Sequence, residues 1–166
     1  MLRILVVEDS EPWRLFISSI IAEDPQLRIV CEVSDGLEAV RKAKELKPDI
    51  ILLDIGLPKL NGIEAARQIR NLIPKSKILF LSQEYWSDVV QEALIFGRGF
   101  VSKEDAGREL LSAVKALDSD KPYLSSSLAP QIARDRRHSI ISGSVHAGQG
   151  QNQHSGVVAA DRDLSS

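Results

Sequence analysis

The chain has 166 residues, 43% of them hydrophobic and 27% charged, and a formal net charge of -2. This is the balance of a soluble globular domain, and so small a charge gives no bulk attraction to nucleic acid or to an anionic membrane. A single cysteine excludes an intrachain disulfide, and no apolar run has the length of a signal peptide or a membrane span, so the sequence predicts a cytoplasmic protein.

Apolar segments of strand length alternate with helical patterns over the first 117 residues. A strand is predicted at 3–7, and apolar residues at helical spacing predict a helix over 10–23. The alternation then continues with strands at 28–33, 49–55, 77–82 and 99–103 and helices at 36–46, 62–72, 87–96 and 104–117. The strand at 49–55, DIILLDI, lacks polar alternation, which is typical of a parallel strand covered on both faces.

Five successive β-α units predict an α/β fold with a doubly wound, five-stranded parallel sheet and helices on both faces. Five units are too few for an eight-fold barrel. After residue 128 the chain becomes rich in Gly, Ser, Gln and His and loses its periodicity. The sequence therefore predicts one domain at 1–128 and a low-complexity, disordered tail at 129–166.

Polar residues stand where the predicted strands end. Glu8 and Asp9 follow the first strand, Asp54 the third, Ser82 the fourth and Lys103 the fifth. A doubly wound sheet brings these ends to one edge, so three carboxylates and a lysine are expected to meet there. Three acids repel one another, and Lys103 together with a divalent cation that prefers oxygen ligands, such as Mg²⁺, would balance their charge.

These residues resemble the receiver domain of two-component response regulators over residues 1–128, and in particular the receivers that usually precede a LuxR-type helix-turn-helix. The matching segments are ILVVEDSEPWR, DIILLDIGLPKLNGIEAARQIR, ILFLSQE, GFVSKEDAGRELLSAV and KPYLSSSL. The resemblance implies a flavodoxin-like (βα)5 fold with strand order 2-1-3-4-5 and a role in phosphorelay signal transduction.

The resemblance also implies a role for individual residues. Asp54 would accept the phosphoryl group, Ser82 would hydrogen-bond a phosphoryl oxygen, and Lys103 would pair with it. Phe100 would be an aromatic switch that turns inward when Ser82 moves, and so would reshape the face formed by the fourth helix, the fifth strand and the fifth helix. The implied ligands of Mg²⁺ are Glu8, Asp9, Asp54 and the backbone carbonyl of Gly56.

The implied phosphoryl donor is a sensor histidine kinase or a histidine phosphotransfer protein, and further partners would be a downstream protein and a second copy of the chain. The activity would be Mg²⁺-dependent phosphorylation and dephosphorylation of the protein itself, not catalysis on a separate substrate. Neither a two-helix pattern nor a basic recognition helix follows residue 128. We therefore expect a single-domain response regulator that binds neither DNA nor membrane.

Two departures from the family pattern leave alternatives open. The segment GRGF at 97–100 is one residue shorter than usual, and Gln83 is larger than the residue expected after Ser82. A pseudo-receiver that binds proteins without being phosphorylated is one alternative. A small flavodoxin-type enzyme is the other, although acids replace the phosphate-binding loop that such an enzyme needs after its first strand.

Overall fold

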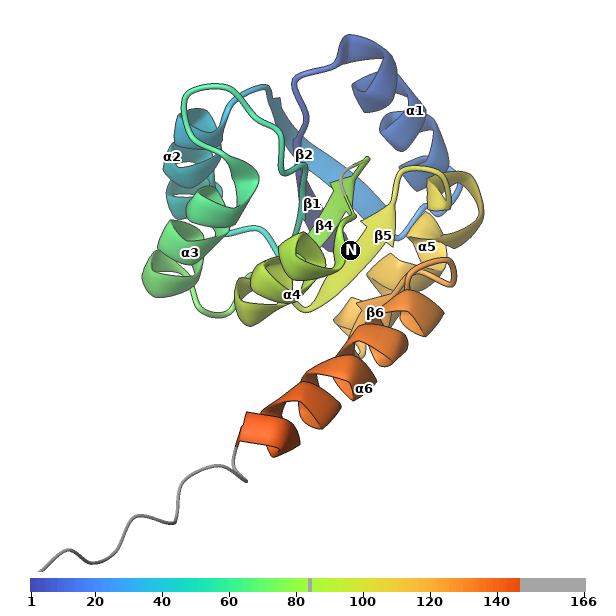
Figure 1. Cartoon of the computed structure of the whole chain (residues 1–166). Coiled ribbons are helices and arrows are strands. Elements are labelled where there is room, and N and C mark those ends of the chain that lie inside the picture. Colours follow the sequence, from blue (N-terminus) through green and yellow to red (C-terminus); the bar gives the residue numbers. More distant parts are fainter. Residues whose placement is uncertain (84, 147–166) are drawn as a thin grey trace, which may run out of the picture.

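The computed structural model describes residues 1–83 and 85–146, which form one parallel sheet with helices on both faces (Figure 1). The strands are β1 (Leu2–Val7), β2 (Leu27–Val33), β3 (Ile50–Leu53), β4 (Lys77–Ser82), β5 (Gly99–Ser102) and β6 (Tyr123–Leu124). The helices are α1 (Glu11–Ile21), α2 (Gly36–Leu46), α3 (Gly62–Leu72), α4 (Ser87–Phe96), α5 (Ala106–Asp118) and α6 (Ala129–His146). Within this described part, no helix is both long and apolar enough to cross a membrane.

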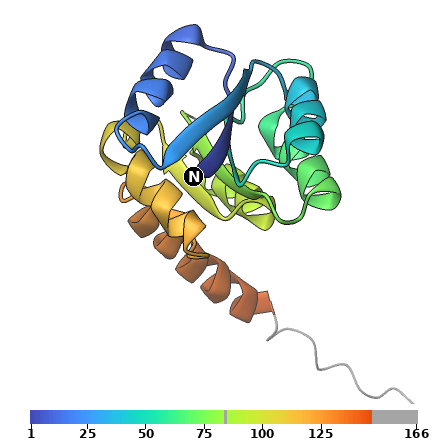
Figure 2. The ribbon, with the colours of Figure 1, turned by 180° about the vertical axis from the view of Figure 1, so that it is seen from behind.

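The sheet divides the core into two clusters of buried side chains. Along β1, Ile4 and Val6 belong to the cluster that includes α1 and α5, whereas Leu5 and Val7 belong to the cluster that includes α2, α3 and α4. The two groups of helices lie on opposite faces of the sheet, as the two opposite views show (Figures 1 and 2). Burial of both faces explains why the central strands are apolar throughout, and it confirms the predicted doubly wound α/β fold.

The strand register brings the carboxyl ends of the central strands to one edge of the sheet. Val7 of β1 pairs with Leu53 of β3, Leu53 pairs with Phe80 of β4, and Phe80 pairs with Phe100 of β5. The strand order is β2-β1-β3-β4-β5-β6. The first five strands thus follow the expected order, and the polar residues that come after β1, β3 and β5 are neighbours.

Within the described residues the sheet has six strands, so the prediction of five was one strand short. Tyr123 and Leu124 of β6 pair in parallel with β5, and the Tyr123 N–H donates to the Arg98 carbonyl at 3.2 Å. The Ser125 N–H then donates to the carbonyl of Phe100 at 2.9 Å. A strand of two residues is too short to show a period of two, which is why the sequence pattern did not reveal it.

Residues 129–146 form helix α6, so the prediction of a disordered tail was wrong for this segment, and residues 147–166 lie outside the described residues. Pro130 fits the first turn of the helix, where its missing N–H costs nothing. Leu128 and Ile132 are only 1% and 5% exposed and join the core cluster of α2–α4. Two anchors one turn apart are too few to produce a recognisable amphipathic pattern.

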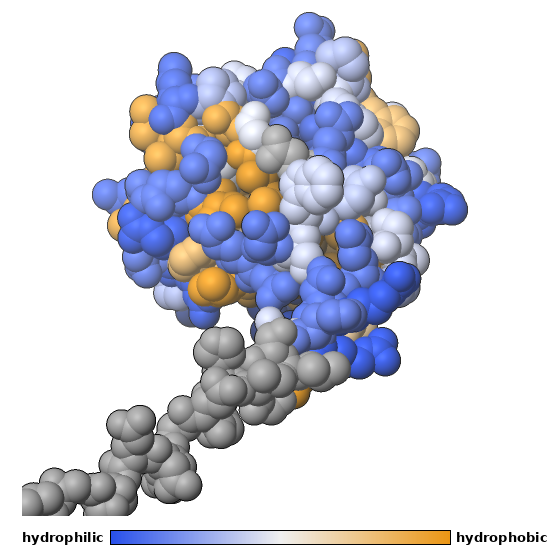
Figure 3. Space-filling view, viewed as in Figure 1, coloured by the Kyte–Doolittle hydropathy of each residue, from blue (hydrophilic) through white to orange (hydrophobic). Residues whose placement is uncertain are grey.

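The outer surface is mostly polar, with single exposed apolar side chains on several helices. Figure 3 shows apolar atoms on the side of the molecule formed by α2, α3 and α4. Leu37 of α2, Leu72 of α3 and Ile95 of α4 are each more than half exposed. Single exposed apolar residues of this kind are ordinary on a soluble domain.

The loop from β3 to α3 packs tightly against the end of the sheet. The Gly62 N–H donates to the Ile55 carbonyl at 2.8 Å, and the Asn61 side chain caps α3 by accepting from the Glu64 N–H at 3.0 Å. A Cβ atom on Gly62 would lie 1.9 Å from the backbone oxygen of Asp54. Only glycine therefore allows the start of α3 to approach Asp54 so closely.

The change Gly62→Ala is expected to lower the free energy of unfolding by roughly 3 kcal/mol, because backbone atoms have to move to admit the methyl group. Gly107→Ala in α5 is the matched control, since its Cβ would meet nothing closer than Phe16 Cζ at 3.5 Å. In a helix that change is neutral or stabilises by up to about 1 kcal/mol. Urea unfolding of both variants measures the difference, and equal stabilities would contradict the tight contact at Gly62.

Candidate functional site

Three carboxylates meet at the carboxyl edge of the sheet, as the sequence predicted. Glu8 and Asp9 come directly after β1, and Asp54 comes directly after β3. One carboxylate oxygen from each of the three lies within 4.8 Å of the others. Glu8 and Asp54 are 1% and 8% exposed, and Asp9 is exposed. Two buried acids and one open to solvent form a pocket that a cation can enter from outside.

Lys103 provides the positive charge inside this cluster. Its Nζ lies 2.7 Å from Glu8 Oε2 and 3.4 Å from Asp54 Oδ2, and its side chain is 5% exposed. The Lys103 backbone N–H donates to the Ser82 carbonyl at 2.9 Å, which ties the end of β5 to the end of β4. A buried ammonium is stable only when it is paired, so Lys103 and the two buried acids depend on one another.

One ammonium does not balance three carboxylates. Burial raises the pKa of Glu8 above its usual range; the nearby Lys103 ammonium acts in the opposite direction, and the charge of Asp54 adds to the rise. Glu8 Oε2 is buried and forms an ion pair, yet among the described residues it accepts no hydrogen bond of regular geometry. The donor set is all oxygen and carries excess negative charge, which fits a hard divalent cation such as Mg²⁺.

A cavity of about 310 Å³ opens onto these groups. Gly56 and the exposed residue Gln83 both border it, so the larger residue after Ser82 lies at the cavity. The lining residues are Glu8, Asp9, Ser10, Trp13, Asp54, Gly56, Gln83 and Lys103. Six of the expected site residues thus lie at one edge of the sheet, counting Ser82 at the end of β4.

Phe100 lies on the other side of β5, away from this cavity. Its side chain is fully buried in the cluster of α2–α4 and stacks on Phe80, with ring centroids 6.1 Å apart. The ring is therefore already in an inward position in this structure. No residue of the short segment 97–100 has a positive φ.

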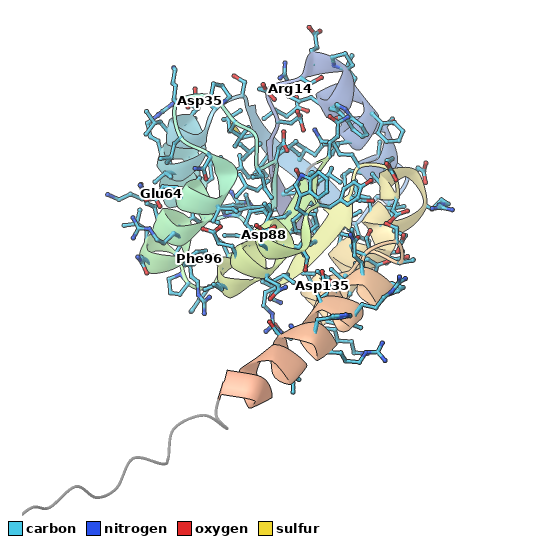
Figure 4. The ribbon with its side chains drawn as sticks, in the orientation of Figure 1. Arg14, Asp35, Glu64, Asp88, Phe96 and Asp135 are labelled. Atoms are coloured by element: carbon cyan, nitrogen blue, oxygen red, sulfur yellow. The ribbon has the colours of Figure 1, made fainter. Side chains whose placement is uncertain are left out.

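Sequence reasoning missed two residues of α1 that hold the acidic loop. Arg14 Nη1 donates to the backbone carbonyl of Glu8 at 2.8 Å, and Arg14 lies at the start of the helix beside the loop after β1 (Figure 4). The indole ring of Trp13 faces the Lys103 ammonium, with 4.8 Å from Nζ to the ring centroid. The apolar spacing that predicts the helix over 10–23 includes Trp13, but it does not indicate a contact with Lys103. Both residues follow the two acids at the end of β1 by about one helical turn. This position in the sequence is the feature that could have indicated their contacts with the acidic loop and Lys103.

Sequence reasoning also missed a buried carboxylate two residues after Lys103. Asp105 is 3% exposed, and its Oδ2 accepts from Ser125 Oγ at 2.6 Å, from Ser102 Oγ at 3.0 Å and from Ser127 Oγ. These hydrogen bonds, led by the one from Ser125, hold the pKa of Asp105 well below its usual range. Asp105 thereby ties the loop that carries Lys103 to the segment that leads into α6.

The neighbouring Glu109 reinforces this connection from α5. Its carboxylate accepts from the Tyr123 hydroxyl at 2.6 Å and from Ser126 Oγ at 2.7 Å. Burial raises the pKa of Glu109, but these hydrogen bonds outweigh it and the net pKa is lowered. Burial and the bond to Glu109 raise the pKa of Tyr123 to about 12.

The sequence comparisons agree with this geometry. The family model described as "Response regulator receiver domain" matches residues 4–115. The transcriptional regulatory protein LiaR of Bacillus subtilis is 32% identical over 140 residues, which cover 84% of this chain and 66% of LiaR. The protein-glutamate methylesterase/protein-glutamine glutaminase of Thermotoga maritima is 43% identical over 105 residues, which cover 62% of this chain and 30% of that protein.

Solved structures give the same result. A LuxR-family two-component response regulator from Aurantimonas sp. SI85-9A1 superposes with a TM-score of 0.79 at 31% identity, covering 82% of this chain and 98% of that one. The response regulator domain of Thermotoga maritima CheB gives a TM-score of 0.64 at 35% identity, covering 69% and 94%.

Fold and acidic site together define a receiver of the two-component type. The chain belongs to the response regulator receiver domain family. The chain spans about two thirds or less of the length of the curated relatives described above.

Proposed function

We propose that this receiver accepts a phosphoryl group on Asp54 from a phosphohistidine of a sensor kinase or of a histidine phosphotransfer protein, and that it does so in the cytoplasm. The observation that carries the proposal is the position of Asp54: its Oδ1 accepts from the Ile55 N–H at 2.8 Å, while its Oδ2 faces Lys103 and the cavity. One oxygen is thus fixed, and the other is presented to an incoming phosphorus.

In the proposed reaction an Asp54 carboxylate oxygen attacks phosphorus in line with the P–N bond of the phosphohistidine. The new P–O bond forms as the P–N bond breaks, and the imidazole leaves with the electron pair. Such a transition state needs positive charge around the phosphoryl oxygens more than it needs acid or base catalysis. Lys103 supplies part of that charge from beside Asp54, and Ser82 at the end of β4 would hydrogen-bond a phosphoryl oxygen.

Mg²⁺ would be held by Asp9, Asp54 and the Gly56 carbonyl, with Glu8 acting through water, and when bound it would supply the remaining positive charge. Dephosphorylation would follow when water attacks the phosphorus, which releases inorganic phosphate and restores the Asp54 carboxylate. The protein would thus control its own phosphorylated state without acting on a separate substrate.

The signal would leave the protein through the face of α4, β5 and α5. We propose that Ser82 moves toward the phosphoryl group when Asp54 is phosphorylated, and that this movement, with Phe100 held in the inward position it already has, presents a different surface to a downstream protein or to a second copy of the chain. A two-state change from 1:99 to 99:1 requires the phosphoryl group to favour the active state by roughly 5.5 kcal/mol.

The test is the intact mass of the full chain after incubation with acetyl phosphate and Mg²⁺. We expect one added phosphoryl group in the wild type, and none in Asp54→Ala or after chelation of the metal. Asp88→Ala, which removes an exposed aspartate from the first turn of α4, should be modified like the wild type. If a known receiver is modified in parallel and this folded chain is not, the pseudo-receiver becomes the better account.

A further inference from the structure

The Lys103 ammonium has contacts on three sides, and the proposed function uses only two of them. Glu8 and Asp54 provide the carboxylates, at 2.7 and 3.4 Å from Nζ. The third contact is the face of the Trp13 indole ring, whose centroid is 4.8 Å from Nζ. These three residues come from different elements: Glu8 from the end of β1, Asp54 from the end of β3, and Trp13 from the start of α1. The lysine is therefore held between three separate elements.

The structure fixes the orientation of this ring. Trp13 lies in the first turn of α1, is half-buried, and meets Phe16 edge to face, with ring centroids 5.4 Å apart and an angle of 77° between the ring planes. It also borders the cavity onto which Asp54 opens. A ring packed in this way presents its face to the ammonium without having to be ordered when the phosphoryl group arrives.

An aromatic face attracts a cation by a means different from that of a carboxylate. The attraction requires the cation to lie over the ring face but needs no hydrogen bond aimed at a single atom, and the ring carries no charge. The ammonium can therefore shift from Glu8 and Asp54 toward a phosphoryl oxygen while it keeps this contact. The ring also keeps water away from one side of the ammonium, which strengthens the attraction between Lys103 and the phosphoryl oxygens.

We infer that Trp13 is a positioning residue for phosphoryl transfer, one that acts through Lys103 and does not touch the phosphoryl group. The inference rests on the proposed function, because it concerns the same lysine. In this role Trp13 holds the ammonium at the cavity while the ammonium shifts from Glu8 and Asp54 toward a phosphoryl oxygen.

The experiment measures the rate of phosphorylation by acetyl phosphate at saturating Mg²⁺, using the full chain. Trp13→Leu should slow the reaction roughly three- to thirtyfold, the range that a cation–π contact spans. Trp13→Phe keeps a weaker aromatic face and should fall between Trp13→Leu and the wild type. Trp86→Leu, which removes the other tryptophan from an exposed position, and Leu15→Ala, which alters an exposed position on α1, should leave the rate unchanged.

A second set of variants separates positioning from a structural role. In a Lys103→Met background the change Trp13→Leu should have no further effect, since the ring has no ammonium to hold. An equal slowing in both backgrounds would show that Trp13 merely supports the fold, and would overturn the inference. If Trp13→Leu does not fold, as judged by urea unfolding, Trp13→Met replaces it, because a flexible apolar side chain fills the same space.

The outcomes also distinguish this inference from the proposed function. A wild type that is phosphorylated on Asp54 at the same rate as Trp13→Leu overturns the role of Trp13 and leaves the proposed function intact. A wild type that is not phosphorylated at all overturns the proposed function, and the role of Trp13 with it.

Discussion

Replacement of Lys103 by methionine is expected to slow phosphorylation of Asp54 about 100-fold, the usual cost of removing one preorganised group that stabilises transition-state charge. Methionine preserves most of the apolar stem and removes only the ammonium. That ammonium lies 3.4 Å from Asp54 Oδ2. Within residues 1–83 and 85–146 no other lysine or arginine forms an ion pair with Asp54, so its positive charge is not replaced in the variant. The rate is measured by intact mass at saturating Mg²⁺ and acetyl phosphate.

The same variant should depend on Mg²⁺ for its stability. Without the ammonium, Glu8 and Asp54 are two buried carboxylates without a counter-charge, and breaking a buried ion pair costs about 3–5 kcal/mol. Thermal unfolding should therefore show a larger rise in Tm on adding Mg²⁺ in Lys103→Met than in the wild type. Lys115→Met is the control, because Lys115 is exposed on α5 and pairs with Asp24 at 3.5 Å. An unchanged rate in Lys103→Met would refute the proposed role of the lysine.

The change Asp105→Ala should lower the free energy of unfolding by roughly 3–5 kcal/mol, among the largest effects of any single substitution in this domain. It removes the acceptor shared by the hydroxyls of Ser102, Ser125 and Ser127, and it leaves the two buried ones, those of Ser102 and Ser125, without this partner. Asp135→Ala on the exposed side of α6 should change stability by less than about 0.5 kcal/mol. Urea unfolding at neutral pH measures both, and a near-neutral Asp105→Ala would show that the serines find other partners.

The pH dependence of stability provides a second measure of Asp105. Its pKa in the folded protein lies below the ordinary value of 3.8, mainly because Ser125 and Ser127 donate hydrogen bonds to the carboxylate. The unfolded state then binds the proton more readily, so this stabilisation is fully present above pH 3.8 and is lost as the pH falls toward the folded-state pKa. Asp105→Asn cannot titrate, and its stability should fall less steeply on acidification than that of the wild type. If the stabilities of the wild type and of Asp105→Asn fall equally steeply on acidification, this explanation of the Asp105 pKa is wrong.

Most of the fold could be predicted because the apolar patterns and the residues that end helices indicated the same elements. The apolar run before Asp54 has the length of one buried strand, and Pro48 ends the preceding helix pattern, so β3 was found with a boundary error of one or two residues. The site followed from topology alone. Once five parallel strands were assigned, Glu8, Asp54 and Lys103 had to lie at the same edge of the sheet.

The features that the sequence did not reveal depend on contacts that produce no periodic pattern of apolar residues. Asp105 at the start of a predicted helix reads as a solvent-exposed cap, and only the packing of the chain after α5 shows that three serines surround it. The two-residue strand β6 and the two anchors of α6 are likewise defined by what they pack against. Trp13 was correctly assigned to a helix, but an amphipathic pattern does not distinguish packing into the core from packing against a charged side chain.

The packing of Leu128 and Ile132 has a practical consequence for where this domain can be cut. The family model ends at residue 115, before the end of α5, before β6, and before both of these buried residues. A protein shortened to that boundary would expose the Phe100 side of the core and would lose every serine donor of Asp105 beyond Ser102. The length of chain that folds as a unit therefore exceeds the length that the family model matches, and it reaches at least to Ile132 in the first turn of α6.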